Sequence, residues 1–408
     1  MNIVYHFRVR GIGAEAVHIA GIAGGWAQLG HDVQFVSPSG IDPLRAPAPV
    51  PAATTTPQHA TPAWVRLLHG LADHAPQLAF EALEIAYNAV AVPRLLRALT
   101  RWQPELLYER HAFFNVAGSI AAGRRKIPHV VEVNELSGYE RARDQKLVGL
   151  AQRAERFVFQ RARLVVCVSD FLTERVRELT EGRVPAITIP NAVGREWLEA
   201  KIPEPELVAL RQRLGLGDEP VVGFVGALIE WHNFPLLLQA FQQARARVPR
   251  AVLLIVGDGR ERRTIEAHAE RLGVRQALRF TGRVSHPEVR RLIELCQVTV
   301  IPQSNAFRSP IKMFEYMAAS KPVVAPGTEP ILDVLEHGRT GLIFDASGRG
   351  LGEAITAALT DEALARRLGR AARAEVEARY TWEAHSRRIL EESGLSEERR
   401  GVRHAAAE

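Results

Sequence analysis

The chain has 408 residues, of which 47% are hydrophobic and 24% charged, and its formal net charge is +6. This composition is that of an ordinary globular protein, and the length is sufficient for two domains with cores of their own. The positive charge suits an anionic substrate or a membrane surface, but the arginines are dispersed among glutamates without interleaved aromatic residues, which argues against a nucleic-acid partner.

The number of cysteines and the length of the apolar runs indicate in which cellular compartment the protein works. Cys167 and Cys296 lie in apolar runs, as small buried residues do, and a chain this poor in cysteine fits a reducing compartment. The N-terminal sequence MNIVYHFRVRG has charges inside any apolar segment, unlike a secretory signal, and no apolar run approaches the roughly 18 residues that span a bilayer. We therefore expect a cytoplasmic protein, with contact at the inner face of the membrane left open.

The chain begins with the pattern of a strand, a glycine loop, a helix and a second strand at 32–36. Gly11 and Gly13 permit close approach of a ligand to the backbone at the helix start, although a merely tight turn has the same composition. Glu15 and His18 follow on the helix. Without a ligand they would be a first-turn glutamate that favours the helix dipole and a packed histidine.

A connector and a helical region come next. Residues 46–62 are rich in proline, alanine and threonine and predict a flexible connector. Residues 64–102 predict helices, with breaks at Pro76 and Pro93. Their arginines either face a membrane or a lipid-like acceptor, or form the solvated side of a core helix.

Polar residues then cluster where two predicted strands, 106–108 and 129–133, come to their ends. The first group is Glu109, Arg110 and His111, and the second is Glu132, Asn134 and Glu135. The carboxyl ends of parallel strands line the ligand crevice of an open sheet, so we predict a binding site here. Neighbouring carboxylates there could raise a pKa and supply an acid or base, and exposed loop charges are the alternative.

The stretch NAFRSPIKMFEYMAASKPVVAP, residues 305–326, predicts a loop, a helix and a buried strand. Ser309 suits the N-cap, with Pro310 in the first turn. The unpaired N–H groups of Ile311 and Lys312 would then form an anion site suited to phosphate. Glu315 lies further along the helix and could accept hydrogen bonds from hydroxyl groups. A phosphate site followed by a site for hydroxyl groups outlines a nucleotide site. The alternative is an ordinary amphipathic helix with a solvated lysine and glutamate.

The segment SPIKMFEYMAASKPVVAP resembles the donor-binding segment of retaining glycosyltransferases of the GT-B fold, family four. The resemblance covers most of the chain and implies an α/β protein of two doubly wound Rossmann-like lobes facing a central cleft, with the C-terminal helix crossing back to the first lobe. We expect an acceptor-binding lobe at 1–195, completed by a helix at 381–392. A linker region at 196–217, a donor-binding lobe at 218–380 and a frayed tail at 393–408 would follow.

The resemblance also implies roles for individual residues. Glu315 would bind the ribose of a nucleotide-diphosphate sugar, the glycine loop would lie beside the donor phosphates, and Glu15 and His18 would border the acceptor. The expected substrate-binding residues are Gly11, Gly13, Glu15, His18, Glu109, His111, Glu132, Glu135, Arg283, Val284, Phe307, Arg308, Ser309, Pro310 and Ile311, with Arg283 and Val284 near the nucleobase.

Four positions depart from the family pattern. Phe307 stands where a glutamate usually handles the donor sugar, Asn134 where a histidine is frequent, and Ala227 and His232 where an arginine and a lysine clamp the diphosphate. His232 could donate to phosphate, protonate the leaving group or be a core histidine. More of the diphosphate charge would then rest on Lys312, the helix dipole and Arg308.

We therefore predict a retaining transferase that moves a sugar from a nucleotide diphosphate to an acceptor hydroxyl, with Glu315, Lys312, His232 and Asn134 in its catalytic site. No D-x-D sequence is present, so we predict no metal ion and no cofactor besides the nucleotide-sugar co-substrate. A sugar-nucleotide epimerase or hydrolase of the same fold, and a non-catalytic subunit with a degenerate donor site, are the alternatives.

Overall fold

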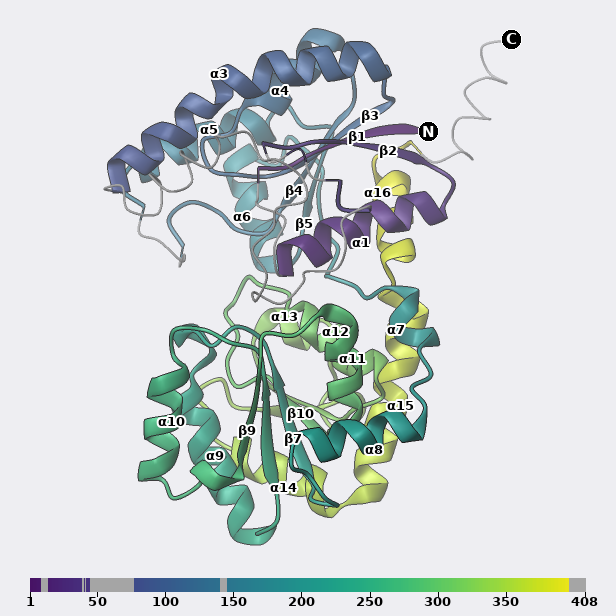
Figure 1. Ribbon diagram of the computed structural model, residues 1–408. Helices are drawn as coiled ribbons and strands as arrows, with labels where there is room; N and C mark the ends of the chain where they lie inside the picture. The colour runs from purple at the N-terminus through teal and green to yellow at the C-terminus, as the bar shows by residue number, and fades with distance from the viewer. Residues whose placement is uncertain (9–13, 39, 41, 45–76, 140–144, 396–408) are drawn as a thin grey trace. The chain divides into compact units, whose positions relative to one another are not determined.

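The computed structural model describes residues 1–8, 14–38, 40, 42–44, 77–139 and 145–395, and it divides into two compact units (Figure 1). The first unit consists of the described residues up to Pro190 together with those from Trp382 onward. The second unit is Asn191–Thr381. The connector predicted at 46–62, Gly11 and Gly13 lie outside the described residues.

The first unit is built on a six-stranded parallel sheet in the order β2-β1-β3-β4-β5-β6. Its strands are short apolar runs buried on both faces, as parallel sheets require. The order changes direction between β1 and β3, where His6 lies opposite Glu109. The strands are β1 (Asn2–His6), β2 (Asp32–Val36), β3 (Leu106–Arg110), β4 (His129–Val133), β5 (Leu164–Cys167) and β6 (Ala186–Thr188).

Helices cover both faces of this sheet (Figure 1). The helices are α1 (Ala14–Gln28), α3 (Gln77–Trp102), α4 (Ala117–Arg125), α5 (Val148–Phe159), α6 (Asp170–Thr180) and α16 (Trp382–Glu392).

The break predicted at Pro93 is wrong, because α3 continues through it. Proline removes one helical hydrogen bond, but Ala91 and Leu95 on either side of it are buried, and packing of this face keeps the helix intact.

The C-terminal helix α16 belongs to the first unit, as the fold class predicted. It packs on α1, where Gly21 and Gly25 make room for it: a Cβ on Gly21 would lie 2.2 Å from the indole of Trp382. Two hydrogen bonds fix the pair, from Trp26 Nε1 to the Ser386 carbonyl at 3.1 Å and from the Ser386 hydroxyl to the Ile22 carbonyl at 2.9 Å.

The second unit has its own six-stranded parallel sheet, in the order β12-β11-β10-β7-β8-β9. Here the order changes direction between β7 and β10. The strands are β7 (Val221–Val225), β8 (Val252–Val256), β9 (Leu278–Gly282), β10 (Val298–Val300), β11 (Val323–Pro326) and β12 (Leu342–Phe344). The two doubly wound sheets of the predicted fold class are thus confirmed.

Helices again cover both faces (Figure 1), and the range predicted as a linker, 196–217, includes α8 and all but the first residue of α7. The helices are α7 (Arg195–Glu199), α8 (Glu204–Arg213), α9 (Phe234–Arg247), α10 (Arg262–Arg271), α11 (His286–Glu294), α12 (Ile311–Ala318), α13 (Glu329–Leu332), α14 (Leu351–Thr360) and α15 (Glu362–Arg379), with 3₁₀ turns η1 (Glu230–His232) and η2 (Arg275–Ala277).

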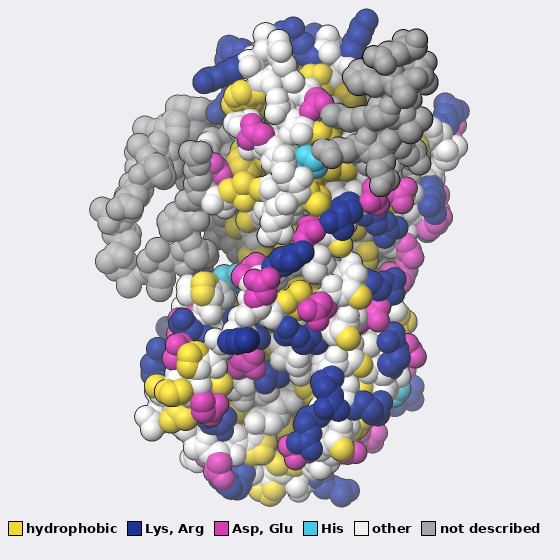
Figure 2. Space-filling view, turned by 90° about the vertical axis from the view of Figure 1, so that its right-hand side faces the viewer, with side chains coloured by type: hydrophobic (Ala, Val, Ile, Leu, Met, Phe, Trp, Pro, Cys, Tyr) yellow, Lys and Arg dark blue, Asp and Glu magenta, His cyan; other side chains and the backbone are white. Residues whose placement is uncertain are grey.

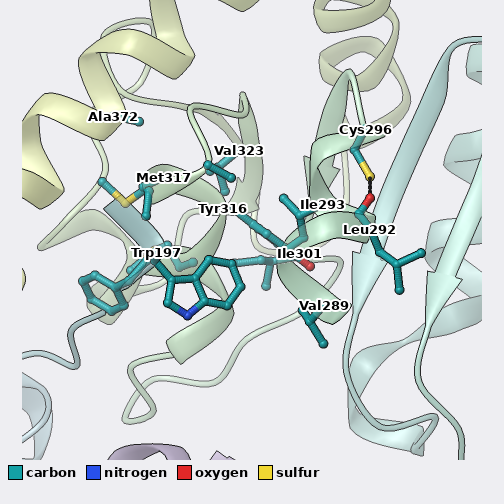
Figure 3. Packing of buried hydrophobic residues seen from close by; sticks show 14 of the residues in the cluster. Trp197, Val289, Leu292, Ile293, Cys296, Ile301, Tyr316, Met317, Val323 and Ala372 are labelled. Carbon is teal, nitrogen blue, oxygen red and sulfur yellow. Dashed lines mark hydrogen bonds between the residues drawn. The ribbon is translucent and has the colours of Figure 1, made fainter. Parts of the chain in front are cut away.

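One apolar core of the second unit joins α7, α11, α12 and α15 to the sheet. Figure 3 shows Trp197 of α7 and Tyr316 of α12 in this cluster. The Tyr316 hydroxyl also accepts a hydrogen bond of 2.8 Å from the Val225 backbone N–H. Helix α12 is therefore fixed to the carboxyl end of β7.

Charged side chains are mixed over the visible surface. On the face shown in Figure 2, Lys and Arg are interspersed with Asp, Glu and apolar groups rather than gathered in one stripe. Among the described helices, none has the length and apolar character needed to cross a membrane.

Candidate functional site

The second unit carries a candidate site at the point where its strand order changes direction. In open α/β sheets, ligands bind beyond the carboxyl ends of the strands at this point. The connection after β7 contains Gly226 and, in η1, His232; the loop after β10 contains Arg308, and Lys312 lies in the first turn of α12.

The loop after β10 is shaped by Asn305. Its side-chain oxygen accepts hydrogen bonds from the backbone of Phe307 and Arg308, the latter at 2.9 Å. The predicted N-cap at Ser309 is wrong by one residue: Pro310 is the N-cap, and the Ser309 hydroxyl accepts instead from the Asn191 backbone at 3.1 Å. The anion site at Ile311 and Lys312 survives this shift, since the first backbone N–H groups of a helix have no acceptor within it.

Lys312 places its ammonium group in an apolar setting. The Nζ atom is buried, has no hydrogen-bond partner among the described residues, and lies 4.4 Å from the ring centroid of Phe224. Burial lowers the pKa of Lys312 to about 7, against the opposing effect of the Glu315 charge. A buried ammonium without an acceptor is costly unless a ligand supplies the acceptor.

His232 lies beside this lysine, and Gly226 separates them. Gly226 has φ +150, and a Cβ on it would lie 2.6 Å from Lys312 Nζ and 3.4 Å from His232 Nε2. Burial, with the charges of Lys312 and Arg308, lowers the pKa of His232 to about 2, so the imidazole is neutral. A neutral ring can still donate one hydrogen bond to phosphate, and its Nδ1 is buried without a partner in the described structure.

Arg308 and Phe307 complete this edge of the site. The Arg308 guanidinium stacks on Trp231, 4.1 Å from the ring centroid, which fixes a second cation near His232. Phe307 is buried, with only 4% of its surface exposed. The Thr328 hydroxyl, beyond the end of β11, is another buried group without a hydrogen-bond partner in the part of the chain that is described.

Glu315 is buried, and His286 occupies one of its oxygens. His286 Nε2 lies 2.7 Å from Glu315 Oε1, and the glutamate side chain is 7% exposed. Among the described residues, Oε2 accepts no hydrogen bond and remains available. Arg283 is exposed and Val284 half-buried in the turn that precedes His286.

The first unit has a second set of polar residues at its strand ends, and these are paired with one another. Glu109 is 1% exposed and faces His6 Nδ1 at 2.6 Å, His129 Nε2 at 2.9 Å and Asn115 Nδ2 at 2.8 Å. Gly118 provides the space, because a Cβ there would lie 2.0 Å from Glu109 Oε2. Both carboxylate oxygens of Glu109 are therefore occupied from within the unit.

Glu132 is paired as well. Its Oε1 lies 2.5 Å from His18 Nε2 and 2.6 Å from Arg110 Nη1, and its Oε2 accepts from the Tyr5 hydroxyl at 3.1 Å. Asn134 also donates to Oε1.

The raised carboxylate pKa predicted for these strand ends is wrong. Burial by itself would raise the pKa of Glu132, but the charges of His18 and Arg110 outweigh it and hold that pKa well below its usual range. Burial is likewise outweighed at Glu109, where the hydrogen bonds from His129 and His6 hold the pKa well below normal.

The remaining predicted residues of the first unit lie around these pairs. His111 Nε2 is 3.3 Å from Glu155 Oε1, Glu135 is half-buried, and Glu15 is exposed in the first turn of α1. The sequence did not indicate the importance of His6, His129, Trp231, His286 or Thr328. A signal existed only for His286, which follows the turn expected near the nucleobase.

Two family models match the chain in succession. The model described as Glycosyltransferase Family 4 matches residues 15–197, and the model described as Glycosyl transferases group 1 matches residues 209–375. This chain belongs to the family-four, group 1 glycosyltransferases. Their GT-B fold accounts for the two doubly wound sheets.

Individual relatives of this glycosyltransferase are distant. Alpha-D-kanosaminyltransferase of Streptomyces kanamyceticus is 26% identical over 48% of this chain and 50% of its own length. A GDP-mannose-dependent alpha-(1-6)-phosphatidylinositol monomannoside mannosyltransferase of Mycobacterium tuberculosis is 29% identical over 46% of this chain and 51% of its own. The match thus spans about half the length of these curated relatives.

A solved structure supports the fold over nearly the whole chain. Anabaena HepE in complex with UDP superposes with a TM-score of 0.68, covering 96% of this chain and 99% of HepE, at 18% identity.

Proposed function

We propose that this protein transfers a sugar from a nucleotide-diphosphate sugar to an acceptor hydroxyl, with retained configuration and without a metal ion, in the cytoplasm. The observation that carries the proposal is the buried ammonium of Lys312, which has no acceptor among the described residues and lies at the start of α12 beside His232. A diphosphate supplies the missing negative charge, and Glu315, one turn further along α12, suits the ribose hydroxyls. The GDP-mannose dependence in the name of the mycobacterial relative and the UDP bound to HepE agree with this class of donor.

The chemistry follows from what these groups can do. The bond between the sugar C1 and the diphosphate oxygen breaks, and its electron pair stays on the phosphate. Lys312, the amides of Ile311 and Lys312, and a hydrogen bond from His232 stabilise that charge. The acceptor oxygen forms the new bond on the same face of the sugar and passes its proton to the leaving phosphate, so no protein nucleophile is required.

Turnover tests the proposal against its alternatives. The purified protein is incubated with UDP- and GDP-sugars, and nucleoside diphosphate release is followed with and without hydroxyl-bearing acceptors. A transferase releases nucleotide in proportion to acceptor. Release without acceptor indicates a hydrolase, an altered sugar nucleotide indicates an epimerase, and no turnover with any pair indicates a non-catalytic subunit.

Metal independence has its own test. Activity should survive excess EDTA, because Lys312 and the α12 amides neutralise the diphosphate in this proposal. Loss of activity in EDTA that returns with Mg²⁺ or Mn²⁺ contradicts it.

The ribose role is tested by Glu315→Ala. We expect UDP or GDP affinity to fall about tenfold, since a charge-assisted hydrogen bond to the ribose is lost, and calorimetry measures the change. Unchanged affinity would mean that Glu315 does not contact the nucleotide.

A further inference from the structure

The proposed donor chemistry does not use the contact between His286 and Glu315 in the second unit. Glu315 Oε1 receives His286 Nε2 at 2.7 Å, while Oε2 accepts no hydrogen bond from the described residues. The terminal χ3 torsion of a glutamate, which orients its two carboxylate oxygens, is broad and otherwise loosely fixed. A donor held on one oxygen therefore decides where the other oxygen points.

We propose that His286 is a positioning residue, whose imidazole holds Oε1 of Glu315 so that Oε2 accepts the hydroxyl groups of a bound pentose. This inference rests on the proposed function, because it takes Glu315 as the pentose acceptor. It adds a residue that makes no contact with the reacting atoms and acts through Glu315 alone.

His286 is itself held in place. It is the first residue of α11, and its ring lies against Trp197 of α7 with 5.3 Å between centroids. Trp197 is 3% exposed and belongs to the core of the unit shown in Figure 3. Because the turn at 282–284 leads directly into α11, one hydrogen bond links the expected nucleobase turn to the pentose carboxylate.

The charged groups around His286 come from three helices. Glu315 of α12 lies in contact, with Lys312 one turn before it, and Glu196 of α7 acts at longer range. On α11 itself the helix dipole opposes a cation at the first residue. Arg290, one turn on, stacks over Trp197 with its guanidinium carbon 5.8 Å from the ring.

The balance of these groups favours the imidazolium. Burial lowers the pKa of His286, but the hydrogen bond and charge of Glu315, together with the charge of Glu196, outweigh burial and raise it above its ordinary value of 6.5. The hydrogen bond to Glu315 is therefore charge-assisted at and below that pH. Once the imidazole loses its proton at higher pH, the attraction between opposite charges is lost and only a hydrogen bond from a neutral ring to the carboxylate remains.

The test compares wild-type protein with His286→Gln, whose amide can donate but cannot carry charge. UDP and GDP are the probes, and calorimetry gives Kd from pH 6 to pH 9. The ratio of the two Kd values cancels the titration of Lys312 and of the phosphate, which both proteins share. We expect the variant to bind about fivefold more weakly near pH 6 and the ratio to fall towards one at pH 9. His268→Gln on α10 is the matched histidine control, with a ratio of one throughout.

Two further variants separate positioning from a structural role. In a Glu315→Gln background, His286→Gln should have no further effect on Kd, since its action passes through the carboxylate. Glu196→Gln removes one of the negative charges that raise the pKa of His286. In a protein that keeps His286, this variant should therefore lose nucleotide affinity at a lower pH than wild type does.

The outcomes are distinct. A Kd ratio that stays constant with pH, or an effect of His286→Gln that persists without Glu315, overturns the positioning role while leaving donor binding intact. Failure of wild-type protein to bind either nucleotide overturns the proposed function itself.

Discussion

The first unit surrounds the buried carboxylates at its strand ends, Glu109 and Glu132, with donors, whereas the second unit buries the ammonium of Lys312 and leaves it without an acceptor among the described residues. Glu109 faces two histidines and an amide, and Glu132 faces a histidine, an arginine and a tyrosine hydroxyl. Lys312 contacts the face of Phe224 instead.

Burying a charge costs several kcal/mol unless a partner compensates it. At Glu109 and Glu132 the partners are side chains of the same unit, so these charges are compensated without a ligand. At Lys312 the described residues supply no acceptor, so the amine either gives up its proton, as its lowered pKa allows, or receives a bound anion. The difference indicates that the cluster around Lys312, rather than the paired carboxylates, can receive a charged ligand.

The largest effect is expected from breaking a paired cluster with Glu109→Gln. The amide cannot serve both histidines as acceptor, so His6 and His129 lose a buried partner, and we expect the first unit to lose about 3 kcal/mol of stability. Urea unfolding followed by circular dichroism measures it. Glu178→Gln is the control in the same unit: it breaks an exposed ion pair with Arg175 at 2.6 Å, and because solvent screens that pair it should change stability by less than about 1 kcal/mol. If both variants lose the same stability, the buried cluster around Glu109 does not stabilise the unit more than an exposed ion pair does.

The opposite behaviour is expected at the unpaired charge. Lys312→Met keeps the side-chain packing on Phe224 and removes a charge that costs stability, so the unfolding midpoint should stay constant or rise. UDP or GDP affinity should fall about 100-fold, because a charge-assisted contact to the diphosphate is lost.

Lys321→Met sharpens this contrast. Lys321 Nζ is paired with Glu294, 3.1 Å from its Oε2 and 2.9 Å from its carbonyl oxygen. Its replacement should lower stability and leave nucleotide affinity unchanged. If Lys312→Met instead destabilises the protein and binds nucleotide normally, the lysine is structural.

The sequence predicted β1 to β4, β11 and the position of α12, since these depend on local periodicity and on loop residues. It did not predict which side chains pair, because the partners are far apart in the chain: His6 and Glu109 meet only when β1 and β3 align. The error at Glu109 and Glu132 has the same origin, as neighbouring carboxylates suggested a raised pKa until their cationic partners were known. Pro93 shows the converse, since a local rule predicted a break that packing of α3 prevents.

The smallest effect, and the finest test of the unpaired ammonium, is the pH dependence of donor binding. Burial lowers the pKa of Lys312 to about 7, so in the free protein the ammonium predominates below pH 7 and the neutral amine above it. An anion binds the protonated form, and therefore nucleoside diphosphate affinity should fall about tenfold from pH 7 to pH 9, a range in which the phosphate, with its last pKa near 6, stays ionised. Lys312→Arg keeps its charge throughout this range and should flatten the profile to the smaller part contributed by His286. Calorimetry at five pH values with UDP or GDP measures both slopes, and a wild-type profile as flat as that of Lys312→Arg would mean that the ammonium of Lys312 is not the group that receives the diphosphate.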